Sequence, residues 1–300
     1  MPTVSEIEVE AEFEELAPKK PWLGVLGTAI RKQPLGAAGA GVVLAMILMA
    51  VFADFLTVYD PEINKFEVML TAPNDQYLLG TDQFGRDVLT RIIYGSRTAL
   101  FVGFTAAIVG ATLGLILGVA SAYFGGTFDL LFQRVMDVFM AFPLIVMALA
   151  VVATLGTGTV NVIIAITIPF IARCARVVRS NALAIREIPY VDAARALGFS
   201  HARIILRHMV PNVMAPYLIM LTSFVGQAIL LEASLSYLGM GVQEPTPSWG
   251  LMLQGGAEEF AESAPWVAIW PGVAISLAVF GFNLFGDAVR DTLDPKLRSR

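Results

Sequence analysis

Five long stretches without a charged residue most constrain how this chain can fold. They cover residues 33–53, 98–128, 138–172, 209–231 and 263–286. A helix that crosses a membrane needs about 20 apolar residues, so each stretch is long enough to cross. Hydrophobic residues form 56% and charged residues 15% of the 300-residue chain, more apolar surface than a soluble domain of this length can bury. The sequence therefore predicts an all-α integral membrane protein.

The stretch at residues 138–172 is too long for a single crossing. At residues 156–161 it is interrupted by Gly-Thr-Gly-Thr-Val-Asn, a sequence typical of a turn. We expect one helix to end near Leu155 and another to start near Val160 and continue to about Val178. The prediction is therefore six membrane-spanning helices.

Lysine and arginine residues are concentrated on one side of the predicted spans. If the N-terminus is cytoplasmic, 16 of the 20 basic residues face the cytoplasm, and the other four are Lys65, Arg86, Arg91 and Arg97. Basic residues favour cytoplasmic loops. The sequence thus predicts a multi-pass protein of the plasma (inner) membrane with both termini in the cytoplasm.

The spans and loops divide the chain into five segments. The first is acidic, with six glutamates among its first 15 residues, and it has too few apolar residues to fold alone. We expect an acidic cytoplasmic tail at 1–20, an interfacial helix at 21–34, the first transmembrane helix and an outer segment at 35–97, a transmembrane core at 98–290 with a cytoplasmic loop at 179–211, and a cytoplasmic tail at 291–300.

Residues that usually perform enzyme chemistry are scarce. No Gly-Lys dipeptide occurs, so the chain has no Walker A loop for nucleotide phosphates. Cys174 is the single cysteine, and with the two histidines, His201 and His208, it is too little for a metal site or a catalytic triad. The sequence predicts a protein that is not an enzyme and has no cofactor, so energy for uphill transport comes from an ion gradient or from another subunit.

Charged residues inside the predicted spans are few. Asp54 and Glu232 fall towards the outer ends of the first and fifth spans, and Arg173 and Arg176 towards the inner end of the fourth. Gradient-driven carriers bind their ions near the membrane midplane, so this placement disfavours an ion-coupled carrier. We expect Glu232 either to line an outer vestibule or to hold the following loop.

Gly110, Gly114 and Gly118 form a strip of small residues on the second span. Such a strip allows another helix to approach closely. It suits either an interface with another subunit or packing inside this bundle, and the need to pack six helices favours the second interpretation.

The cytoplasmic loop is predicted to contain two short helices. Pro189 suits the first turn of a helix, and Gly198 suits the position after its end, where a positive φ is common. Ser200 suits the N-cap of a second helix that Pro211 is expected to stop. The small side chains at 193, 194 and 196 suit docking into a protein groove. An amphipathic loop resting on anionic lipid is the alternative.

The same loop resembles the EAA loop of ABC importer permeases. That motif runs Glu-Ala-Ala-x3-Gly-x9-Ile-x-Leu-Pro, and here residues 192–194 read Asp-Ala-Ala, followed by Gly198 and by Val-Pro at 210–211. Asp192 replaces the usual glutamate and keeps its carboxylate. Three further stretches are similar to the C-type permease subunit of dipeptide and oligopeptide ABC importers, at 79–95, 232–239 and 287–295.

The resemblance implies a six-helix type I permease without an ATP site, whose cytoplasmic EAA loop couples it to ATPase subunits. It implies a heterodimer with a second homologous permease, two ABC ATPases, an extracytoplasmic substrate-binding protein and no nucleic acid. The implied ATPase-coupling residues are Asp192, Ala193, Ala194, Arg195, Leu197, Gly198, Ser200 and Arg203. Two other functions stay open: a self-sufficient gradient-driven carrier or channel, and an ABC permease for nickel chelates, opines or oligosaccharides.

Overall fold

The computed structural model describes residues 33–257 and 259–293. The acidic tail predicted at 1–20 lies outside these residues, as do nearly all of the interfacial helix predicted at 21–34 and most of the tail predicted at 291–300.

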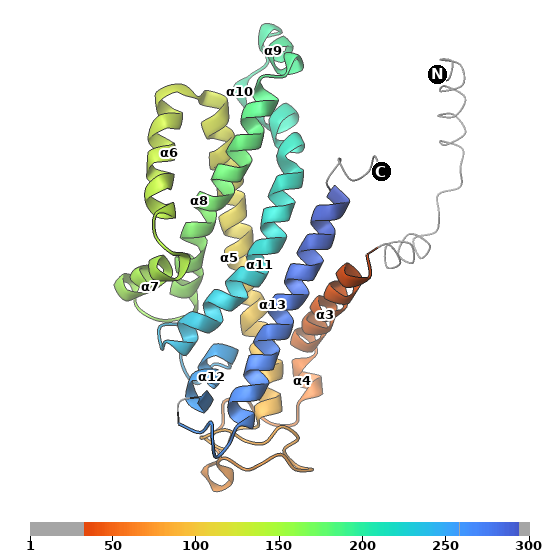
Figure 1. Ribbon diagram of the computed structural model, residues 1–300, viewed down its shortest axis with the longest axis vertical. Helices are drawn as coiled ribbons and strands as arrows, with labels where there is room; N and C mark the ends of the chain where they lie inside the picture. Colours follow the sequence, from red (N-terminus) through yellow and green to blue (C-terminus); the bar gives the residue numbers. More distant parts are fainter. Residues whose placement is uncertain (1–32, 258, 294–300) are drawn as a thin grey trace, which may run out of the picture.

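The described part of the chain is helical and has no β-strand, only an isolated bridge between Thr81 and Asp87. Five helices are long and apolar enough to cross a membrane: α3 (Pro34–Val51), α5 (Val88–Phe124), α8 (Thr159–Arg186), the continuous helix His201–Tyr237, and α13 (Trp266–Leu293) (Figure 1). The shorter elements are α4 (Ala53–Leu56), η1 (Phe66–Val68), α6 (Gly126–Met140), α7 (Leu144–Leu155), α9 (Pro189–Ala196) and α12 (Trp249–Ala257).

The third crossing is not the straight helix that the sequence predicts. Helix α6 begins at Gly126, before the charge-free stretch at 138–172, and is followed by α7 at an angle of 92°. Pro143 is the N-cap of α7, and a proline lacks the backbone donor that a continuous helix needs and disfavours a helical residue before it. The bent pair returns the chain from the end of α5 to the start of α8 (Figure 1), and counted as one span it brings the candidate crossings to six.

Pro211 does not stop the second cytoplasmic helix, contrary to the prediction. Helix α10 (His201–Ile204) continues through a π-helical turn, η2 (Ile205–Met209), and a 3-10 turn, η3 (Val210–Val213), into α11 (Met214–Tyr237). The wider and then tighter turns change the hydrogen-bonding pattern locally, so the missing N–H of Pro211 does not break the helix.

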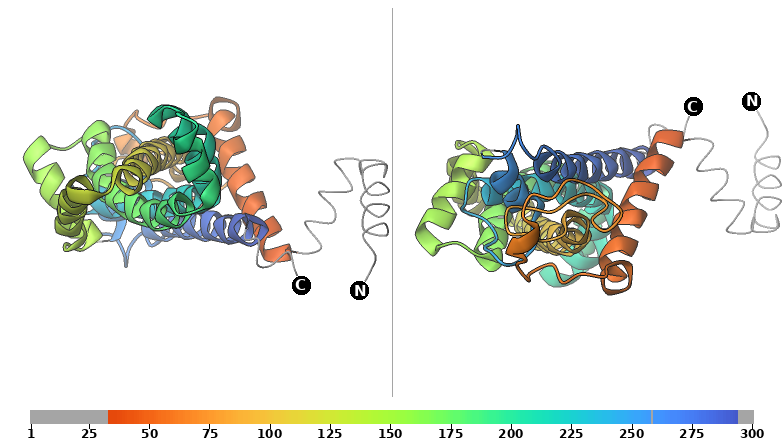
Figure 2. Two further views of the ribbon diagram at one scale, coloured as in Figure 1. Left: turned by 90° about the horizontal axis from the view of Figure 1, so that it is seen from above. Right: turned by 90° about the horizontal axis from the view of Figure 1, so that it is seen from below.

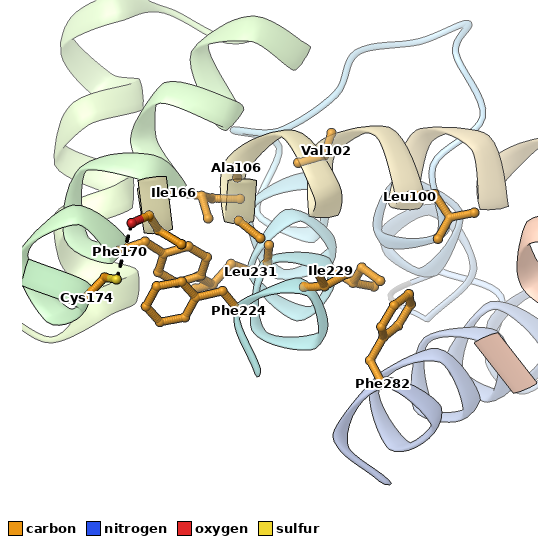
Figure 3. Packing of buried hydrophobic residues seen from close by; sticks show 14 of the residues in the cluster. Leu100, Val102, Ala106, Ile166, Phe170, Cys174, Phe224, Ile229, Leu231 and Phe282 are labelled. Atoms are coloured by element: carbon orange, nitrogen blue, oxygen red, sulfur yellow. Dashed lines mark hydrogen bonds between the residues drawn. The ribbon is translucent and has the colours of Figure 1, made fainter. Parts of the chain in front are cut away.

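Helix α5 lies at the centre of the bundle and packs along α8. A Cβ atom at Gly110, Gly114 or Gly118 would lie 2.7 Å, 2.5 Å and 2.6 Å from atoms of α8, so only glycine permits this approach. The strip therefore packs inside the bundle, which confirms the favoured interpretation. Beside it, the stacked rings of Phe170 on α8 and Phe224 on α11 lie 4.1 Å apart in the buried core (Figure 3).

The two ends of the bundle differ in structure. Helices α9 and α10 form one end, towards which α13 runs, while α3 starts nearer the middle of the long axis (Figure 1). The opposite end is formed by residues 57–87 and by α12, and residues 57–87 lie across the start of α5 (Figure 2).

Candidate functional site: the α9–α10 corner and the opposite end

Helix α9 ends at a sharp corner built by Gly198. The residue has φ +76°, as the sequence predicts, and its N–H donates to the carbonyl of Arg195 at 2.9 Å. Ser200 is the N-cap of α10, as expected, and accepts a hydrogen bond from the N–H of Arg203 at 3.4 Å. A Cβ on Gly198 would meet no atom within 4 Å, so the corner faces open space.

The exposed side of this corner contains most of the implied coupling residues. Leu197 is 74% exposed, a high value for a large apolar side chain. Ala194 points the other way and is only 4% exposed, so it packs against the bundle rather than facing a partner. The exposed members of the predicted set are Asp192, Ala193, Arg195, Leu197, Gly198, Ser200 and Arg203.

Leu206, which is not among the predicted coupling residues, is a second exposed large apolar side chain, nine residues after Leu197. It is 65% exposed on the turn that continues α10, while Ile204 is buried at 1%. The sequence signal was available, because apolar residues on opposite faces of one short helix cannot all be buried. We call Leu197, Leu206 and the exposed residues between them the corner surface.

The corner surface is fixed to two membrane helices. The hydroxyl of Tyr190 on α9 donates to the carbonyl of His208 at 2.9 Å, and the side-chain amide of Asn212 donates to the same carbonyl at 2.7 Å. On the other side, the hydroxyl of Tyr123 on α5 is hydrogen-bonded to Nδ1 of His201 at 2.7 Å. These bonds connect α9 to the turns that continue into α11, and α10 to the end of α5.

At the opposite end, Glu232 is buried, with 1% exposure. Its Oε1 accepts hydrogen bonds from the hydroxyls of Ser236 and Ser248, both at 2.8 Å. Because Ser248 precedes α12, the carboxylate ties α11 to the loop that follows it, while a role in a vestibule stays a prediction.

A charged network at the same end was not identified from the sequence. Nε of Arg86 donates to Asp82 at 2.7 Å, and its Nη1 donates to Glu244 at 2.6 Å, joining residues 57–87 to the loop after α11. Burial by itself lowers the pKa of Arg86, but the bonds to Glu244 and Asp82 outweigh it and raise the pKa, so the side chain stays charged. Arg91, fully buried in the first turn of α5, donates to the carbonyl of Pro61 at 2.8 Å.

The available sequence signal for this network was the stretch at 79–95, whose resemblance to peptide permeases includes Asp82, Arg86 and Arg91 but does not reveal their partners.

Residues 110–299 match the family described as binding-protein-dependent transport system inner membrane component, and residues 27–78 match the N-terminal TM domain of oligopeptide transport permease C. The chain belongs to this family of ABC importer permeases. The resemblance to the C-type subunit is thereby confirmed.

Named relatives agree with the assignment of this permease. It is 44% identical over 260 residues to a putative peptide transport system permease protein of Brucella suis, with 87% of each chain covered. A dipeptide transport system permease protein of Alkalihalophilus pseudofirmus is 41% identical over 270 residues, covering 90% of this chain and 88% of the relative. A glutathione transport system permease protein of Escherichia coli is 41% identical over 270 residues, covering 89% and 88%.

Among solved structures, a chain of the MetNI methionine ABC transporter in an inward-facing conformation shares the fold. The TM-score is 0.55 at 18% identity, with 69% of this chain and 97% of that chain covered. The predicted type I permease fold is thus confirmed. The permease is a multi-pass inner-membrane transport component and not an enzyme, and its family works with a second permease, an ATPase and a substrate-binding protein.

Proposed function

We propose that this permease forms half of the translocation path of an ATP-driven importer for dipeptides and oligopeptides. The match to the N-terminal domain of an oligopeptide permease supports this substrate class, and so do relatives named for peptides, dipeptides and glutathione. A second, homologous permease supplies the other half as a heterodimer.

Two ATPase subunits provide the energy, one of them docked on the corner surface. The observation that supports this role is the exposure of Leu197 and Leu206 on a corner whose hydrogen bonds lead into α5 and α11. Apolar side chains this exposed, rimmed by Arg195 and Arg203, are typical of a protein interaction site. A loop that rests on anionic lipid explains the arginines but not the hydrogen bonds that connect the corner surface to the bundle.

The corner surface faces the cytoplasm, and both termini lie on that side. Arg186, Arg195, Arg203 and Arg207 lie at this end, in agreement with the preference of basic residues for cytoplasmic loops. The opposite end, with residues 57–87 and α12, receives the extracytoplasmic binding protein.

Purification with co-expressed neighbouring subunits tests the proposal. In sealed vesicles, we expect an ATPase to co-purify and uptake of radiolabelled dipeptides and tripeptides to require ATP hydrolysis and the binding protein. Uptake by this chain alone, driven by a proton or sodium gradient, would refute it. Uptake of nickel chelates or oligosaccharides in place of peptides would refute the substrate class while leaving the ATPase coupling intact.

A further inference from the structure

Three arginines follow one another along the middle of α8 at intervals of three residues. Two are neutralised by aspartates of α6: Arg176 pairs with Asp137, and Nε of Arg179 donates to Asp129 at 2.5 Å. These pairs hold the two helices together where both carry mostly apolar residues. The third, Arg173, is different.

The guanidinium of Arg173 turns towards α11 instead of α6. Its Nη1 donates to Oε1 of Gln227 at 3.2 Å, and no carboxylate among the described residues lies within 4 Å of it. Part of each side chain stays exposed. A guanidinium has five N–H donors, and a neutral amide oxygen occupies only one of them here. The site therefore holds an uncompensated positive charge with free donors.

This charge lies deep in the bundle. Helix α8 continues to Arg186, beyond the end expected near Val178, so Arg173 sits about 20 Å from either end of the helix. Gln227 is likewise near the middle of α11. One turn away on each helix lie Phe170 and Phe224, whose stacked rings mark the apolar centre (Figure 3).

An arginine at this depth is costly when it faces lipid, and such residues face water-filled cavities or charged partners. Given the proposed function, on which this inference rests, the water-filled cavity is the path between the two permeases. Every unmodified peptide has a C-terminal carboxylate whatever its sequence, and this group needs a counter-charge to cross an apolar region.

We propose that Arg173, oriented by Gln227, lines the translocation path and binds the C-terminal carboxylate of the peptide in transit. The planar guanidinium can hold a carboxylate through two parallel N–H···O bonds. A single weak amide contact keeps the guanidinium in place without neutralising it. Recognition of the carboxylate alone lets one site pass peptides of many sequences.

The first test measures ATP-dependent uptake of a dipeptide by the reconstituted complex. Arg173→Gln is expected to lower the uptake rate at least tenfold with all subunits still assembled, and Arg173→Lys to stay within threefold of wild type. Arg176→Gln is the matched control, one turn away on the same helix, and is expected to stay within threefold. The proposal is overturned if Arg173→Gln takes up peptide at the normal rate or if the variant releases the second permease. It is also overturned if Arg173→Lys or Arg176→Gln loses as much uptake as Arg173→Gln.

The second test uses chemical replacement of the charge. Arg173→Cys in a Cys174→Ala background is treated with a cationic trimethylammonioethyl or an anionic sulfonatoethyl methanethiosulfonate. We expect the cationic reagent alone to raise uptake at least fivefold, and saturating cargo peptide with ATP to slow the modification at least threefold. A thiol that neither reagent modifies, equal restoration by both reagents, or no protection by the peptide overturns the assignment.

The Cys174→Ala complex separates this inference from the proposed function. If that complex imports no peptide with ATP although the wild-type complex does, the test is repeated in a Cys174→Ser background, because serine is closest in size to cysteine. If the wild-type complex itself imports no peptide, the proposed function fails. If the wild-type complex imports peptide and substitutions of Arg173 do not reduce that import, only the carboxylate site fails.

Discussion

Replacing Gly198 by tryptophan tests the corner surface most directly. Within the permease the first cost of the substitution is in the backbone, because φ is +76° and a Cβ at this position meets no atom within 4 Å. A non-glycine residue in this conformation costs about 1 kcal/mol. That is a small fraction of the stability of a folded protein, so the permease is expected to insert and fold.

The effect on the ATPase is expected to be much larger. A tryptophan projecting from the corner prevents a partner from covering Leu197, which is 74% exposed in the isolated chain. Burying one leucine contributes about 1.5–3 kcal/mol, so losing this contact alone weakens docking roughly tenfold to a hundredfold. We therefore expect Gly198→Trp to abolish ATP-dependent uptake.

The assay compares ATPase co-purification and vesicle uptake in three variants. Gly158→Trp is the matched control: Gly158 has φ +117° with nothing within 4 Å of a Cβ, but it lies at the opposite end, where α8 starts. Gly198→Ala adds the backbone cost without the bulk and is expected to retain most activity. Wild-type uptake by Gly198→Trp with its ATPase bound would refute the coupling role of the corner surface.

Three other predictions follow from exposure and hydrogen bonding. Asp192 is exposed and pairs with Arg195 at 3.0 Å, and such a surface pair contributes about 0.3–0.5 kcal/mol to stability. Asp192→Ala should therefore leave folding intact and, in a pull-down assay, weaken ATPase docking less than Gly198→Trp does, whereas Asp192→Glu should be tolerated. Glu232→Gln should assemble normally because its carbonyl oxygen still accepts from the serines; reduced uptake by the assembled variant supports the vestibule role, and normal uptake leaves only the loop-holding role. In a Cys174→Ala background, an impermeant thiol reagent should label Asn74→Cys but not Ser200→Cys in sealed cells; both positions are exposed, so labelling of the second would overturn the topology.

Features determined by local sequence were predictable. The positive φ of Gly198 and the N-cap at Ser200 depend only on residues within one helical turn, and both are found. The charge-free stretches located five long helices because the solvent of these segments is lipid. Pro143 was a visible helix breaker, but the uninterrupted apolar run around it concealed the bend between α6 and α7.

Features that depend on distant contacts were not predictable. Helix α5 starts at Val88, before the charge-free stretch, and its arginines find partners outside the helix; Arg91, for example, donates to the carbonyl of Pro61. The bond between Arg86 and Glu244 joins residues 158 positions apart, and no local pattern indicates it. The orientation of Ala194 is similarly decided by which face of α9 the bundle covers.

The continuous helix from His201 to Tyr237, with its π-helical and 3-10 turns, connects the two ends of the bundle through one element about 55 Å long. If it pivots near its middle, a tilt of about 10° moves each end by about 5 Å, roughly half the 8–10 Å that separates packed helix axes. Movement of the corner surface in one direction therefore moves Glu232 and the start of the loop after α11 in the other. Alternate opening of the two ends then needs no signal relayed through side chains, because a single rotation changes both.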